Sequence, residues 1–148
     1  MCIEKAFKII EKNLDEADFE EGVASEIVEK AENILSVRFP PSYKMFLEKY
    51  GVGDIFGVEI YGIIKDPTID ASAVPNCVWI TQNLRKTIGL PLQYIAIAST
   101  GYGPFYFINT IVRDKDEESP IVIWEKGKVQ SVSKSFGDFL YTELKKAM

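Results

Sequence analysis

The side chains that could carry out chemistry in this sequence are mainly carboxylates, because the chain contains no histidine. Histidine is the commonest general base near neutral pH and the commonest zinc ligand. A Ser-His-Asp or Cys-His nucleophile is therefore excluded. Two groups of acids remain as candidates for acid–base or metal chemistry. They are Asp54, Glu59 and Asp66 in the first group, and Asp114, Asp116 and Glu118 in the second.

Neither group of acids has a pattern that predicts catalysis. Glycosidase-type chemistry requires two carboxyl groups at a defined separation across a cleft, and the spacing of the first group specifies no such geometry. The second group lacks the glycine and the final glutamate of a calcium-binding loop. We expect both groups to be solvated surface and residues 113–120 to form a charged loop.

The glycine and cysteine patterns predict no cofactor and no metal. Gly51-Val52-Gly53 and Gly101-Tyr102-Gly103 complete neither a dinucleotide-binding nor a Walker motif,. Turns that need positive φ explain both. Cys2 and Cys77 lack the spacing of metal ligands, and we expect them to stay reduced. The sequence therefore predicts a protein that is not an enzyme.

The net charge of −5 is concentrated near the N-terminus. Between Glu11 and Glu32, nine acids are accompanied by only two lysines. A nucleic-acid-binding protein normally has a basic face, so we expect no direct binding of nucleic acid. An acidic helical surface would suit a basic protein partner, although an ordinary solvated helix gives the same pattern.

The length of 148 residues favours one domain, residues 1–148, with a substantial core,. No run approaches the roughly 18 apolar residues that a membrane helix needs. The first residues lack the apolar run and cleavage site of a signal peptide. We expect a cytoplasmic protein without membrane contact; these patterns leave its oligomeric state open.

The element with the clearest local signals is a helix from Pro41 to Tyr50. Proline suits the first helical turn, and Gly51 suits the positive φ that often ends a helix,. Apolar residues recur with helical spacing in between, and we expect them to be mainly buried. They are Tyr43, Phe46, Leu47 and Tyr50.

The remaining patterns predict helices before this one and mostly strands after it. Helical spacing covers residues 3–14, with Leu14 on the buried face, and a second helix begins at Ser25 as N-cap; the acidic residues 15–22 are expected to be a loop,. A fourth helix, 78–88, has Ile88 on its buried face, and a fifth follows a capping box at Ser135,. Strands are expected at 55–63, 94–98, 105–108, 121–124 and 128–132, with a loop at 65–76,.

This order of elements predicts an α+β fold. We expect an antiparallel sheet of about four to six strands, with the N-terminal helices and the C-terminal helix packed against it. Residues 94–98 are continuously apolar and are expected to form a central strand buried on both faces,. The segments 99–103 and 125–127 are expected to be hairpin turns,.

Four aromatic residues lie in or beside turns and strand ends. An amphipathic ring at such a place can be half exposed and serve as a binding anchor, although packing in the core is the alternative. Together with two acids near the glycine-rich turns, these rings are the predicted partner-binding residues. The set is Asp54, Glu59, Tyr61, Trp79, Tyr102 and Tyr106.

The segment from Glu29 to Gly51 resembles the N-terminal signature of the SUKH superfamily, the Smi/Knr-like proteins. Its core is the pattern Pro-x-x-Tyr-x-x-Phe-Leu, here from Pro40 to Leu47. Residues 57–63, 94–108 and 133–140 resemble the later strands and the closing helix, so the resemblance covers about residues 25–145. Two turns depart from the usual pattern, at 50–54 and 99–104, and the second lacks the usual acidic residues.

The resemblance implies a non-enzymatic immunity protein, or antitoxin, that binds and neutralises a cognate polymorphic toxin such as a nuclease. Nucleases bind phosphates through Lys and Arg, so an acidic protein could compete for the same surface. Three alternatives are open. One is a regulatory protein-binding scaffold, like the yeast cell-wall regulators of this superfamily. Another is a small-molecule-binding domain that uses the open face of the sheet with Tyr61, Trp79 and Tyr106. The third is an enzyme, which the absence of histidine disfavours most,.

Overall fold

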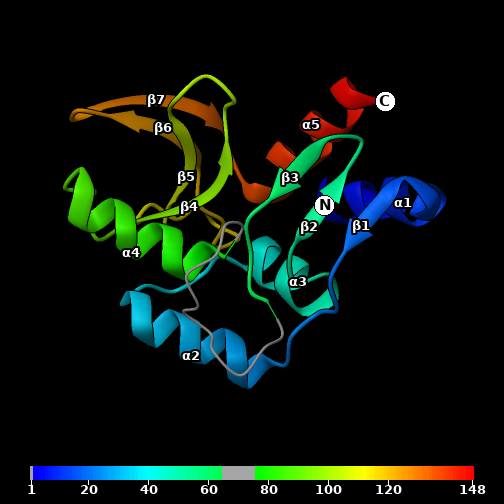
Figure 1. Cartoon of the computed structure of the whole chain (residues 1–148), viewed down its shortest axis with the longest axis horizontal. Helices are drawn as coiled ribbons and strands as arrows, with labels where there is room; N and C mark the ends of the chain where they lie inside the picture. Colours follow the sequence, from blue (N-terminus) through cyan, green and yellow to red (C-terminus); the bar gives the residue numbers. More distant parts are fainter. Residues whose placement is uncertain (1, 65–75) are drawn as a thin grey trace.

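The computed structural model describes residues 2–64 and 76–148, and it confirms the predicted α+β class (Figure 1). Its helices are α1 (Cys2–Lys12), α2 (Ser25–Leu35), α3 (Pro41–Lys49), α4 (Cys77–Thr87) and α5 (Phe136–Ala147), with one 3-10 turn, η1 (Leu14–Glu16). Its strands are β1 (Ala17–Phe19), β2 (Gly53–Ile55), β3 (Val58–Ile60), β4 (Tyr94–Ser99), β5 (Phe105–Asn109), β6 (Ile121–Glu125) and β7 (Lys128–Ser133). No helix in the described part is long and apolar enough to cross a membrane.

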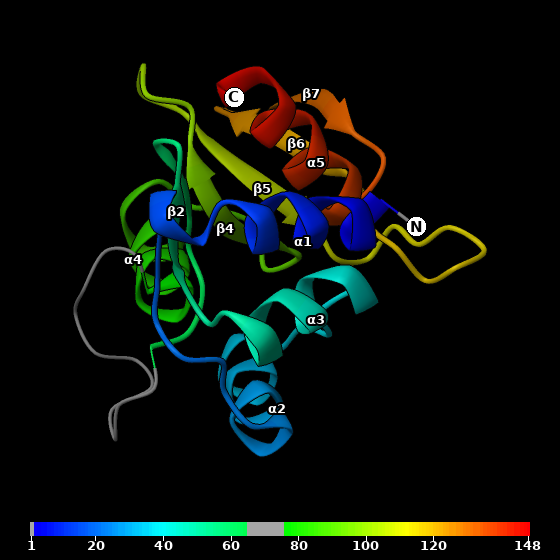
Figure 2. The ribbon, with the colours of Figure 1, turned by 90° about the vertical axis from the view of Figure 1, so that its right-hand side faces the viewer.

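The strands form two antiparallel sheets, in the orders β1-β2-β3 and β4-β5-β6-β7. The backbone N–H of Tyr61, just after β3, donates to the carbonyl oxygen of Ile97 in β4 at 2.7 Å, which joins the sheets. In Figure 1, α4 lies against the concave side of the larger sheet, and Figure 2 shows α1 and α5 side by side. The predicted burial of both faces of β4 is confirmed, although β4 is an outer strand in the order of its sheet.

Helix α3 occupies the centre of the core. Tyr43, Phe46 and Leu47 are fully buried and Tyr50 is nearly so, as the helical spacing predicted. The rings of Phe46 and Phe136 lie 5.5 Å apart, which packs α3 against α5. The Tyr43 hydroxyl donates to the carbonyl oxygen of Tyr61 at 2.7 Å. Because a buried hydroxyl needs such a partner, this bond fixes the joint between α3 and the end of β3.

The prediction that residues 113–120 are solvated is wrong for Glu118, which is only 5% exposed. One of its carboxylate oxygens accepts the backbone N–H of Ser42 at 2.9 Å, and the other accepts the Ser42 hydroxyl at 2.7 Å. A negative charge at a helix N-terminus is favourable. The Ser42 hydroxyl also accepts the N–H of Gly137 at 3.1 Å. Glu118 therefore holds α3, the 110–120 segment and α5 together.

Other local predictions were wrong where a helix or strand ended earlier than its pattern. Leu14 and Ile88 are 61% and 50% exposed, because α1 ends at Lys12 and α4 at Thr87. Ala24 is the N-cap of α2, one residue before the predicted Ser25.

Three strand and loop predictions also change. The expected loop 15–22 contains β1, and the expected strand 55–63 is interrupted by the turn between β2 and β3. Of the expected loop 65–76, only Asn76 lies among the described residues, where its side chain accepts the N–H of Val78 and caps α4.

Candidate functional site

The outer face of the smaller sheet carries one carboxylate on each of its three strands. Asp18 in β1 is directly opposite Asp54 in β2, and Asp54 is directly opposite Glu59 in β3. Directly opposed residues share a face, with Cβ atoms about 4.5–5.5 Å apart. Asp18 and Glu59 are exposed and Asp54 is partly buried. We call these three residues the acidic ladder.

The local sequence explains why the ladder forms. Phe56 and Gly57 both have positive φ, 54° and 81°, as a two-residue turn of the type I′ kind requires,. This turn places Ile55 opposite Val58 and therefore Asp54 opposite Glu59. At Gly53, a Cβ atom would lie 2.2 Å from the carbonyl oxygen of Asp18, so only glycine allows β1 to approach β2 this closely,.

The acidic ladder is electrostatically unfavourable in the free protein. Within the described part of the chain, none of its three carboxylates has a hydrogen-bond or ion-pair partner. Like charges directly opposite each other in a sheet are destabilising. Burial raises the pKa of the neighbouring Tyr61 phenol, and the negative charge of Glu59 raises it further.

The ladder does not have the geometry of a metal site. Among residues 2–64 and 76–148, no group of three or more His, Cys, Asp or Glu side chains could hold a metal ion. Carboxylates spaced along a row, one per strand, instead suit several separate cations. A row of lysine or arginine side chains on another protein would match this row of charges, so the ladder is suited to a basic protein surface.

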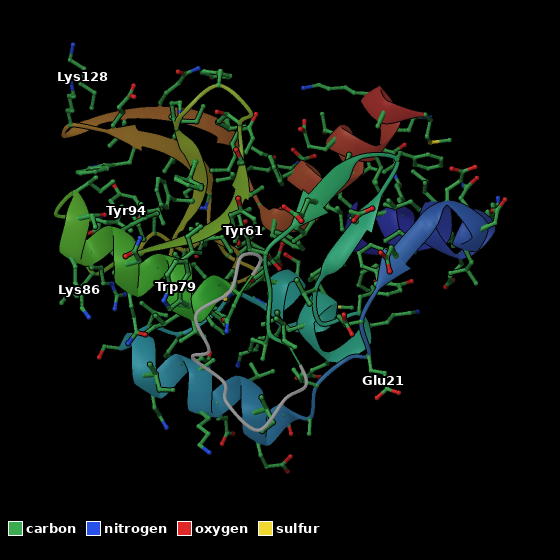
Figure 3. All side chains as sticks on the ribbon, viewed as in Figure 1. Glu21, Tyr61, Trp79, Lys86, Tyr94 and Lys128 are labelled. Atoms are coloured by element: carbon green, nitrogen blue, oxygen red, sulfur yellow. The ribbon has the colours of Figure 1, made fainter. Side chains whose placement is uncertain are left out.

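The predicted aromatic anchors differ widely in their exposure. Tyr61 is only 3% exposed, so it is packed in the core and is not a half-exposed ring; its backbone N–H donates to the carbonyl oxygen of Ile97 in β4, and Figure 3 labels it between β3 and β4. Trp79 is partly buried in the first turn of α4. Tyr106 is partly buried and packs 4.9 Å from the ring of Phe139 in α5. Tyr102, 73% exposed, lies in the turn between β4 and β5.

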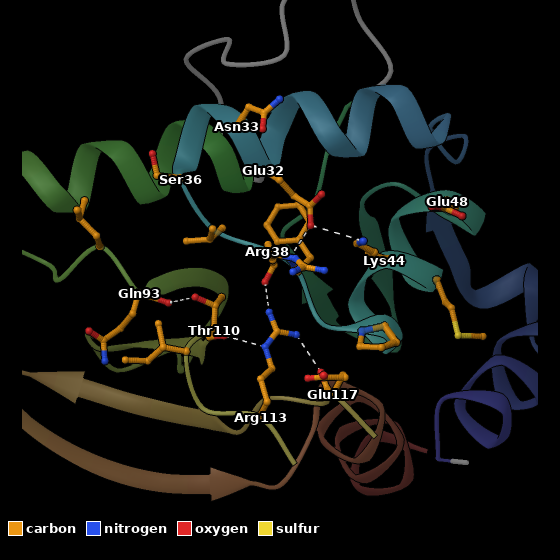
Figure 4. Close-up of a pocket in the computed structure, with 16 residues that line it drawn as sticks. Glu32, Asn33, Ser36, Arg38, Lys44, Glu48, Gln93, Thr110, Arg113 and Glu117 are labelled. Carbon is orange, nitrogen blue, oxygen red and sulfur yellow. Dashed lines mark hydrogen bonds and ion pairs between the residues drawn. The ribbon is translucent and has the colours of Figure 1, made fainter. Parts of the chain in front are cut away.

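A groove of about 1190 Å³, which the sequence did not predict, lies between α2 and α3 on one side and the 110–117 segment on the other (Figure 4). Several of its charged side chains have structural partners. Arg113 donates to the carbonyl oxygens of Thr110 and Glu117, both at 2.9 Å, and to that of Arg38.

Glu32, on the opposite wall of this groove, is also satisfied within the fold. Its carboxylate accepts the backbone N–H of Phe39 at 2.7 Å and lies 3.7 Å from the ammonium of Lys44. Such bonds tie the connection between α2 and α3 to both helices. Glu32, Lys44 and Arg113 therefore stabilise the walls of the groove.

Three large apolar side chains on the walls of the groove are exposed. Met45 is 38%, Leu92 64% and Ile111 69% exposed. Leu92 and Ile111 are neighbours of Gln93 and Thr110, whose backbones bond at 3.0 Å, so they project from adjacent chain segments. Larger exposed apolar patches mark protein-binding surfaces, and Leu92 and Ile111 supply two neighbouring side chains for such a surface,.

One comparison with known families bears on these surfaces. A family model described as SUKH_5, SMI1-KNR4 cell-wall, matches residues 3–145. The match begins earlier than the resemblance seen in the sequence and includes α1 and β1. It therefore covers the whole acidic ladder as well as both walls of the groove.

Proposed function

The chain belongs to the SUKH family, and from this premise we propose that it is a non-enzymatic immunity protein that binds and neutralises a cognate toxin. Many bacterial proteins of the superfamily that it resembles act in this way. On this proposal, residues 1–148 form one domain that works in the cytoplasm. It acts by occupying a surface of the toxin and supplies no reactive group.

The observation that carries the proposal is the acidic ladder. Asp18, Asp54 and Glu59 repel one another and have no partner among the described residues. A partner that presents lysine or arginine side chains to this row would relieve the repulsion and add charge-assisted hydrogen bonds. The free energy of binding to such a partner is therefore more favourable than the same contacts would give at a surface whose charges are already neutralised.

The class of toxin follows from the same charge. A nuclease surface that binds phosphate groups is rich in Lys and Arg. We propose that the ladder occupies part of that surface and so prevents the nucleic acid from binding. The hairpin that carries Asp54 and Glu59 is short and closed by a two-residue turn, so the carboxylates are held in a defined row before the toxin arrives,.

The test coexpresses this protein with the candidate toxin from the gene beside its own and scores growth. In the test variant, all three carboxylates of the acidic ladder are changed to the corresponding amides. A matched control has the same change in net charge at three exposed acids outside the ladder, Asp15→Asn, Asp116→Asn and Glu29→Gln. We expect the ladder variant to lose rescue and the control to keep it.

A binding titration separates the electrostatic mechanism from other contacts. The Kd of the wild-type complex should rise when NaCl increases from 50 to 500 mM, because salt screens exposed charges. The ladder variant should bind weakly at both concentrations. Equal affinity of the ladder variant and the control, or a wild-type Kd that does not change with salt, would contradict the proposal.

A second candidate function is a regulatory protein-binding scaffold, which the exposed Met45, Leu92 and Ile111 favour. A scaffold would bind an apolar segment of its partner in the groove of Figure 4. Ile111→Glu would then abolish recovery of that partner from the native cell, while the ladder variant would leave recovery unchanged. Loss of recovery in the ladder variant, with unchanged recovery for Ile111→Glu, supports the immunity function.

A further inference from the structure

A second cavity, of about 260 Å³, is lined by residues of α4 and of the larger sheet. In Figure 1, the end of α4 lies close to the tip of the β6–β7 hairpin. Leu84 and Ile88 form its helical wall. Phe105, Phe107 and Trp124 form its sheet wall. Phe107 is directly opposite Val122, two residues before Trp124, so these rings share the face of the sheet that α4 covers,.

The cavity exists because α4 ends before it has covered this face. The helix ends at Thr87, and Gly89 turns the chain away with a φ of 68°. Ile88 is left 50% exposed on one side of the opening. Val129, directly opposite Trp124 in β7, is left 52% exposed on the other side. Apolar surface therefore continues from the cavity to its rim.

The lining indicates the chemistry of an occupant. The Tyr94 ring supports the indole of Trp124 at 6.3 Å, and the rings of Phe105 and Phe107 are also 6.3 Å apart. Aromatic rings prefer tilted or edge-to-face contact with another ring at such separations. The charged residues of the lining are Glu125 and Lys126, one of each sign, so the lining carries no net charge that would select an ion.

The volume sets the size of the occupant. It exceeds the roughly 150 Å³ of an apolar cavity that holds benzene. It is smaller than the roughly 300–1,000 Å³ of pockets for drug-sized ligands. We propose that this cavity binds a small uncharged aromatic molecule of one or two rings. This site is separate from the acidic ladder, and its occupation does not depend on a toxin.

The two tryptophans provide an internal control for the test. Trp124 lines the cavity, whereas Trp79 lies in the first turn of α4, outside the lining. The full-length protein is titrated with toluene, and the indole N–H signals are followed by NMR. We expect the Trp124 signal to shift until it saturates and the Trp79 signal to remain in place. No saturable shift at Trp124, or equal shifts at both indoles, would overturn the proposal.

Two matched variants test the location. Ile88→Lys places a charge at the opening, whereas Leu92→Lys makes the same change at an exposed residue outside the lining. Both positions are exposed, so both variants should fold, which thermal unfolding checks. We expect Ile88→Lys to weaken toluene binding by at least about tenfold, because the substitution replaces part of the apolar wall with a side chain whose ammonium stays hydrated at the opening, and Leu92→Lys to have no effect. Unchanged binding to Ile88→Lys would overturn the assignment of the site.

Charged analogues of toluene test the class of ligand. Benzoate and benzylammonium have similar size but carry opposite charges. Both should bind more weakly than toluene, because each would lose solvation without meeting a net opposite charge. Tighter binding of either ion would overturn the proposal of an uncharged ligand.

Discussion

The substitution Asp54→Asn should make the free protein more stable. Asp54 is the central member of the acidic ladder and faces Asp18 on one side and Glu59 on the other. The change keeps the shape of the side chain and removes both like-charge pairs. A cross-strand pair contributes about 0.2–1 kcal/mol, so removing two repulsive pairs should raise the free energy of unfolding by about 0.4–2 kcal/mol. In a protein of this size, that corresponds to an increase in Tm of about 1–8 °C.

Urea denaturation at two salt concentrations tests the cause of this gain. The Debye length is about 30 Å at 0.01 M salt and about 3 Å at 1 M, so most of the gain should disappear at the higher concentration. The control is Asp116→Asn. Asp116 is an exposed residue of the 110–120 segment and has no carboxylate opposite it in a sheet. This control should change stability by less than about 0.5 kcal/mol.

Two results would refute the electrostatic argument. One is a loss of stability in Asp54→Asn at low salt, and the other is a gain that stays the same at 1 M salt. Either would mean that the ladder is not a source of repulsion, and the proposed function would then lose the observation that carries it. The expected result, a variant that is more stable but binds the toxin more weakly, is the usual relation between stability and activity at a binding site.

Three further predictions concern the interior. Glu118→Ala should lower the free energy of unfolding by about 3–5 kcal/mol, because two buried donors of Ser42 lose their acceptor,; a urea-measured loss below about 1 kcal/mol would contradict this. Burial raises the pKa of the Cys77 thiol to about 12, so at pH 8 a thiol reagent should label Cys2 alone until the protein is unfolded, and two reactive thiols in native buffer would be inconsistent with that burial,. Burial raises the pKa of the Tyr43 phenol above 10.0, and the neighbouring Cys77 raises it further. Only the unfolded chain therefore loses this proton as the pH rises past about 10, and the free energy of unfolding should fall there by up to about 1.4 kcal/mol per pH unit. Tyr43→Phe should reduce this slope between pH 10 and 11, and an unchanged slope would refute the assignment.

The elements that were predicted well are those with signals inside the element itself. In α3, a proline at the start, apolar residues at helical spacing and Gly51 at the end specify the helix without reference to the rest of the chain. Strand β1 has no such signal. Its three residues form a strand because β2 lies beside them, and this contact depends on Gly53, about 35 positions later. A pairing of this kind cannot be predicted from local periodicity.

The same distinction applies to the candidate site. Asp54 and Glu59 could be predicted because both lie close to glycine-rich turns, and the alternation around Phe56 and Gly57 contains the signal of a hairpin,. The third member of the ladder, Asp18, could not be selected from the many acids near it. Its position opposite Asp54 follows from the register of β1 on β2, which only the structure gives. Tyr61 was included among the predicted partner-binding rings for the same reason, since its burial results from contact with β4.

The carboxylates of this chain belong to two classes that composition cannot separate. Glu32 and Glu118 are buried, and each accepts a backbone N–H at the start of α3 or just before it, so their charge is already used by the fold. The ladder carboxylates have no partner among the described residues and can exchange water for a cation of another molecule. Neutralising a carboxylate of the first class should therefore reduce stability and leave the intrinsic affinity for a partner unchanged. Neutralising Asp54 should do the opposite, and this contrast follows from hydrogen-bond partners and not from net charge.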